Sequence, residues 1–166
     1  MINLQDFQPL NHKKGTSNKL NELVIGLKLL SKYFVVYASV IERWGLVNND
    51  RVGFILPKDD DNLMVFVYFT SNSRRTRKIK KYRTGGWQFA DSALVSLFAK
   101  KYKLNPAIGS YKFYIEHKIC VKLEVETMIE ECYLLVCDPD ERADLTPLEK
   151  QAMKDEYTRI LNQIKS

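Results

Sequence analysis

Short segments in which apolar and polar residues alternate recur along this chain, and a period of two is typical of half-buried β-strands. The first segment begins at Leu23, and the second, Tyr33–Tyr37, is β-branched and aromatic. Residues 63–69 are almost entirely apolar, which predicts a strand buried on both faces. The predicted strands are 23–29, 33–37, 52–56, 63–69, 87–90, 111–116, 119–125 and 132–137.

Three segments show the 3.6-residue period of a helix instead. Residues 38–45 predict a short helix that Gly45 caps, and residues 91–102 predict a second helix. Thr146, Pro147 and Glu149 form a capping box that starts a final amphipathic helix. We expect its apolar stripe to pack on the rest of the protein, with an oligomer interface as the alternative.

The order of these elements repeats. Residues 33–55 and 87–116 both run strand, short helix, polar turn, strand, although two unrelated segments of this kind would look alike. The expected fold is α+β, mainly β: a small barrel (21–137) from two strand-helix-strand halves, 21–70 and 87–137, joined by a basic arm, 71–86. An irregular leader (1–20) precedes the barrel, and a connector with the C-terminal helix (138–166) follows it.

The first half carries a recognisable sequence pattern. Within residues 32–54, Gly45-Leu46 and Asp50-Arg51-Val52 follow the short helix, while Asn49 stands in place of a glycine and Val36-Tyr37 in place of Ile-Pro. This pattern resembles the AbrB-type swapped-hairpin barrels. The resemblance implies two interlocked halves that bind DNA or a toxin partner, and a tandem copy would make the chain a pseudo-dimer. The joining arm would then lie outside the barrel.

The chain has a net charge of +6, but the charge is concentrated. Residues 71–137 carry 13 basic and 6 acidic side chains, and seven of the ten residues in Arg74–Arg83, the basic run, are Lys or Arg. Such a run favours an anionic partner, although a solvated linker has the same composition.

The basic run combines charge with neighbouring hydroxyl and aromatic side chains. Lys and Arg neutralise phosphate, Ser71, Ser73 and Thr76 can hydrogen-bond it, and Tyr82 and Trp87 can stack on bases. Arginines suit bidentate base contacts and lysines suit phosphate. The predicted nucleic-acid-binding residues are Arg74, Arg75, Arg77, Lys78, Lys80, Lys81, Tyr82, Arg83, Trp87, Lys100 and Lys101.

Other chemistry has little support in the sequence. His12 and His117 do not form a metal-ligand cluster, and Asp59–Asp61 are typical of a polar turn. We therefore expect no metal, no cofactor and no enzymatic activity. Three cysteines in apolar segments indicate reduced, inert thiols, and the absence of a signal peptide or an apolar span indicates a cytoplasmic protein that does not contact a membrane.

The leading functional hypothesis is therefore nucleic-acid binding, with DNA favoured over RNA, in a regulatory or architectural role. The alternative is an assembly component of a phage or mobile element. Its basic arm would contact an acidic protein or a packaged genome, and it would form homo-oligomers.

Overall fold

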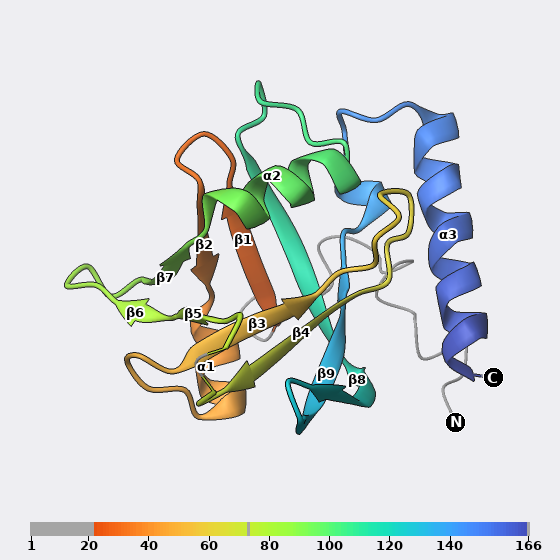
Figure 1. The fold of residues 1–166 in the computed structure, drawn as a ribbon. Coiled ribbons are helices and arrows are strands. Elements are labelled where there is room, and N and C mark those ends of the chain that lie inside the picture. Colours follow the sequence, from red (N-terminus) through yellow and green to blue (C-terminus); the bar gives the residue numbers. More distant parts are fainter. Residues whose placement is uncertain (1–21, 73, 166) are drawn as a thin grey trace.

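The computed structural model describes residues 22–72 and 74–165, which form a mostly-sheet α+β protein (Figure 1). A nine-stranded antiparallel sheet curls into a nearly closed barrel. The elements are β1 (Val24–Lys28), β2 (Tyr33–Val36), α1 (Ala38–Trp44), β3 (Arg51–Ile55), β4 (Val65–Thr70), β5 (Arg77–Lys78), β6 (Lys80–Lys81), β7 (Trp87–Ala90), α2 (Ser92–Lys101), β8 (Ser110–Val125), β9 (Met128–Val136), a 3-10 turn (Pro139–Glu141) and α3 (Pro147–Lys165).

The strand order places the basic run at the seam of the barrel. Neighbouring strands follow the order β5-β3-β4-β9-β8-β1-β2-β7-β6, so β5 and β6 lie at the two edges of the sheet. These two strands are separated in sequence by Ile79 alone. The chain therefore passes from one edge to the other within three residues, and the basic run closes most of the gap that an open sheet would leave.

An aromatic core fills the barrel, and α1 and α2 lie at opposite ends of it (Figure 1). Phe34 stacks on Phe89 with ring centroids 4.8 Å apart, and Phe98 of α2 meets Phe34 edge-on at 5.4 Å. Towards the other end, α1 buries Val40 and Ile41, and its half-buried Trp44 packs on Phe69. Aromatic pairs of this geometry add to the stabilisation from apolar burial, so each helix is held by the side chains it inserts.

Most predicted elements are confirmed within one or two residues. Gly45 caps α1 in the left-handed conformation, with φ of 59°. The capping box is also present, because the backbone N–H of Thr146 donates to Glu149 at 3.0 Å and that of Glu149 donates to Thr146 at 3.1 Å. The strands predicted at 111–116 and 119–125 form one strand, β8, whose pairing with β9 shifts register between Glu116 and Cys120. The polar residues at this irregularity made the strand look like two.

Helix α3 runs along the outside of the barrel wall (Figure 1). Tyr157, Ile160 and Leu161 are buried, and the Tyr157 hydroxyl accepts the backbone N–H of Cys137 at 2.9 Å. The apolar stripe therefore packs on the barrel, as expected, although Leu148 at its start is exposed. Among the described helices, none combines the length and apolar character needed to cross a membrane. The predicted leader and His12 lie outside the described residues.

Candidate nucleic-acid interface

The backbone of the basic run is part of the barrel wall. Lys78 of β5 pairs with Arg51 of β3, and Lys81 of β6 pairs with Trp87 of β7. Between them, the N–H of Ile79 donates to the carbonyl of Asp50 at 2.7 Å, and its carbonyl accepts the N–H of Asn49 at 2.9 Å. The Ile79 side chain is fully buried. The segment thus differs from the arm outside the barrel that the AbrB-type resemblance implied, because burial of this one apolar residue inserts it into the seam.

The start of the basic run is a hydrogen-bonded turn. The side-chain oxygen of Asn72 accepts the N–H of Arg74 at 3.0 Å, and the Thr76 hydroxyl donates to the carbonyl of Asn72 at 2.7 Å. Arg51 then donates to that hydroxyl at 2.7 Å. Thr76 is buried, so its hydroxyl orders the turn and does not face a ligand. Ser71 is exposed, and Ser73 lies outside the described residues.

The three arginines of this part of the run are paired with carboxylates from other elements. Arg74 Nη1 and Arg75 Nε lie 3.3 and 3.0 Å from the carboxylate of Glu126, in the turn between β8 and β9. Arg77 Nε lies 3.1 Å from Asp91, whose other oxygen caps α2 by accepting the N–H of Leu94. The arginines are therefore partly neutralised, which the sequence did not indicate.

The lysines of the run present their charge to solvent. Lys78, Lys80 and Lys81, the lysine row, are exposed, and none forms an ion pair with a described residue. Arg83 is likewise exposed and unpaired in the described chain. Lys78 and Lys80 flank the buried Ile79, and in an extended strand residues two apart share a face. The buried isoleucine thus directs both neighbouring ammonium groups outward.

The aromatic residues beside the lysine row differ in their availability. The Lys81 ammonium lies 5.5 Å from the centre of the half-buried Trp87 ring, a cation–π distance. Tyr82 is 48% exposed in the turn that joins β6 to β7, which Gly85 permits through its φ of 88°. Its N–H donates to Gly86. The Tyr82 ring is therefore the one that is open for a base to stack on, whereas the Trp87 ring is in contact with the Lys81 ammonium group.

Lys100 and Lys101, also predicted to bind nucleic acid, lie elsewhere. They end α2, a helix of ten residues and hence about 15 Å long, whose start lies beside Arg77. Lys100 pairs with Asp60 at 3.1 Å. Lys101 is buried and donates to the carbonyls of Asp59 and Asn62, both at 2.8 Å, and burial lowers its pKa. Its ammonium group holds the loop between β3 and β4 in place and does not extend the charged surface of the lysine row.

No protein-family model matches the chain, and neither curated proteins nor solved structures give a significant match. Function must therefore be inferred from the geometry of the residues themselves. Two partners of the basic run were not among the predicted site residues. Asp91 had a local signal, since it precedes α2 as an N-cap residue, but Glu126 lies 52 positions from Arg74 and had none.

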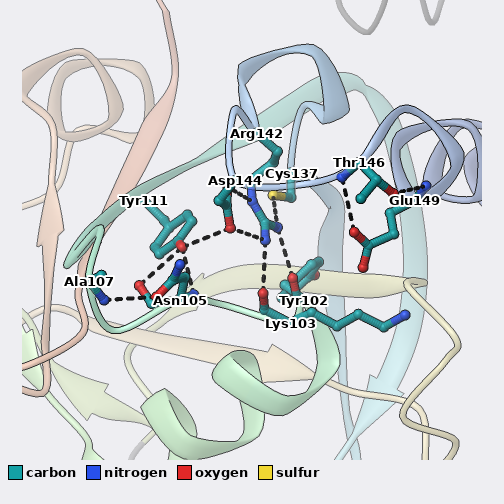
Figure 2. A network of polar contacts seen from close by, with 10 residues as sticks. All are labelled: Tyr102, Lys103, Asn105, Ala107, Tyr111, Cys137, Arg142, Asp144, Thr146 and Glu149. Atoms are coloured by element: carbon teal, nitrogen blue, oxygen red, sulfur yellow. Dashed lines mark hydrogen bonds and ion pairs between the residues drawn. The ribbon is translucent and has the colours of Figure 1, made fainter.

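A second polar cluster surrounds Arg142, just after the 3-10 turn (Figure 2). Its guanidinium donates to both oxygens of Asp144, each at 3.0 Å, and to the carbonyls of Tyr102 and Lys103 at 2.8 and 3.0 Å. A fifth N–H faces Cys137 Sγ at 3.6 Å. A guanidinium has five N–H donors, so none remains for a ligand.

The Arg142 cluster is therefore a structural clasp. It joins the connector before α3 to the end of α2, and through Asp144 to the hydroxyl of Tyr111 on β8 at 3.1 Å (Figure 2). Within residues 22–72 and 74–165, no group of three or more His, Cys, Asp or Glu side chains is arranged to hold a metal ion. The basic surface is the better candidate for a binding function.

We expect one of the three cysteines to react with a thiol reagent such as DTNB in the native protein. Burial raises the pKa of Cys132 to about 11, and burial also raises that of Cys137 to about 11 despite the neighbouring Arg142. Cys120 is exposed. Because the thiolate is the reactive form, DTNB at pH 8 should label Cys120 quickly and the other two only on unfolding. Rapid labelling of the native Cys120→Ser variant would contradict this.

Proposed function

We propose that this protein binds nucleic acid without catalysing a reaction, with DNA favoured over RNA, in a regulatory or architectural role in the cytoplasm. The observation that carries the proposal is the lysine row. Its three exposed ammonium groups have no carboxylate partner in the described part of the chain, and they extend from β5 and β6, between which Ile79 anchors the backbone in the barrel. Lysine side chains of this kind neutralise phosphates and release counterions. Arg83 and Tyr82 extend the surface into the adjoining turn, where Tyr82 can stack on an exposed base.

The ordered backbone of β5 and β6 favours nucleic-acid binding over the alternative that the basic run is a solvated linker. A flexible basic segment loses conformational freedom when it binds, whereas β5 and β6 are already ordered by pairing with β3 and β7. Two carboxylates pair with three of the arginines and partly neutralise them, whereas the lysine row has no carboxylate partner among the described residues. The surface therefore retains its charge where the backbone is paired with neighbouring strands.

We also propose that the barrel consists of two related halves, as in the AbrB-type barrels. The strand order supports this. If β5 and β6 are counted as one strand, exchanging that strand with β1, β2 with β7, β3 with β8 and β4 with β9 gives back the same set of neighbouring strand pairs. The pairing of β2 with β7 is consistent with such an exchange, since Tyr33 faces Ala90 and Val36 faces Trp87. In this proposal the basic run is the counterpart of β1.

The lysine row can be tested with the variant Lys78→Ala, Lys80→Ala, Lys81→Ala. Fluorescence anisotropy with labelled duplex DNA, single-stranded DNA and duplex RNA would be measured across a salt series. We expect the variant to bind duplex DNA at least about ten-fold more weakly, because up to three phosphates are no longer neutralised by a lysine. The slope of log affinity against log salt should become shallower by about 0.9 for each of these phosphates.

A matched control removes three exposed lysines elsewhere, in the variant Lys58→Ala, Lys112→Ala, Lys118→Ala. It changes the net charge equally and should bind nearly as well as the wild type. If both variants bind equally weakly, overall charge explains the effect and the assignment of binding to the lysine row is wrong. If the wild type binds no nucleic acid at low salt but captures an acidic protein through the same lysines, the assembly alternative replaces this proposal.

A further inference from the structure

Arg74 and Arg75 both point at the carboxylate of Glu126. We propose that these two arginines form a phosphate-binding site that Glu126 occupies in the free protein, and that nucleic acid binds it by displacing this carboxylate. The inference rests on the proposed nucleic-acid binding and adds a regulated contact to it. Glu126 would act as an internal competitor that lowers affinity.

The geometry is that of an anion site with an anion already in it. Arg74 Nη1 lies 3.3 Å from one oxygen of Glu126, and Arg75 Nε lies 3.0 Å from the other. Carboxylate and phosphate accept from guanidinium groups in the same manner. The arginine side chains are 73% and 83% exposed, whereas that of Glu126 is 22% exposed. Much of each guanidinium therefore faces solvent, from which a phosphodiester can approach.

Both sides of this contact are fixed by the fold. Arg75 has a φ of 56° and lies within the turn that Asn72 and Thr76 hold together. Glu126 has a φ of 49° in the turn that joins β8 to β9. Non-glycine residues adopt such angles at a cost, which their surroundings must offset. The two turns thus place Arg75 beside Glu126, and this contact can form without movement of any strand.

The contact also differs from that of Arg77 in how easily it can open. The carboxylate of Asp91 caps α2 as well as pairing with Arg77, so displacing it would disturb the helix start. Glu126 pairs with the two arginines in a turn and caps no helix, and exposed ion pairs contribute little to stability. A polyanion can therefore replace Glu126 at low cost, while Arg77 stays in place.

The test is the isosteric variant Glu126→Gln, measured with labelled duplex DNA in the salt series described above. We expect an affinity about three- to ten-fold higher than that of the wild type, since the competing charge is gone. The salt dependence should steepen by up to about 0.9 for each arginine that is released to bind a phosphate. The control is Glu124→Gln, which removes the same charge from the same hairpin at an exposed position that pairs with no arginine of the described residues.

Three results decide the matter. An increase for Glu126→Gln that exceeds that for Glu124→Gln, and that disappears when Arg74 and Arg75 are also changed to Ala, supports the inference. Equal affinities for the two glutamine variants, with a wild type that still binds through the lysine row, overturn it and leave the proposed function standing. A lysine-row variant that binds duplex DNA as tightly as the wild type overturns the proposed function instead, whatever Glu126→Gln does.

Discussion

Replacing Arg142 by Met is expected to lower the free energy of unfolding by about 3–5 kcal/mol, the usual cost of removing one partner from a buried ion pair. The side chains of Arg142 and Asp144 are 3% and 7% exposed, so Asp144 would be left as a buried charge. The carbonyls of Tyr102 and Lys103 would also lose their donor. Urea denaturation followed by tryptophan fluorescence measures the change. Arg43→Met, at an exposed position on α1, is the control and should change stability by less than about 0.5 kcal/mol.

The same pair predicts how this loss depends on pH. Hydrogen bonding to Arg142 lowers the pKa of Asp144 below its ordinary value. A depressed carboxyl pKa stabilises the folded state above the unfolded value, about 3.9, and that contribution disappears as the pH falls through the folded value. The stability difference between wild type and Arg142→Met should therefore be largest near neutrality and shrink below about pH 4. A difference that stays constant down to pH 2 would show that Asp144 is not the group involved.

Changing Ile79 to Ala is expected to cost about 2–5 kcal/mol, as for other fully buried aliphatic side chains. The reason for this cost is specific to the seam. Ile79 lies between β5 and β6 and is the apolar residue that holds the basic run in the barrel wall. Hydrogen exchange of the Ile79 and Asn49 amides should speed up together, since both bond across this seam. Lys78→Ala, one position away and exposed, serves as the control.

The Ile79 experiment also separates two views of the basic run. A solvated linker outside the barrel would tolerate the change with a loss below about 0.5 kcal/mol. If Ile79→Ala and Lys78→Ala prove equally harmless, the run is not part of the wall and the argument from its rigidity fails. A large loss for Ile79 alone would mean that the charges belong to an ordered surface, where their spacing is set before any partner arrives.

Local patterns predicted most of the elements. Alternation identified β1, β-branched and aromatic composition identified β2, and an apolar run identified β4; β3 and β7 were also predicted. Helical spacing with its caps identified α1, α2 and α3. These signals all depend on residues close in sequence. The basic run was the failure. Seven charged residues in ten indicated a loop, although a strand at the seam needs only one inward side chain, and Ile79 supplies it.

The candidate site divides in the same way. The sequence by itself determined that a dense positive charge lies between two strand-helix-strand segments, because charge is a property of composition. Only the tertiary structure decided which charges remain free. Glu126 and Asp91 pair with the arginines, and the β3–β4 loop takes up Lys101, through contacts between residues far apart in the chain. The partners of ion pairs and hydrogen bonds are set by distance in space, so only the folded barrel shows that the lysine row keeps its charge.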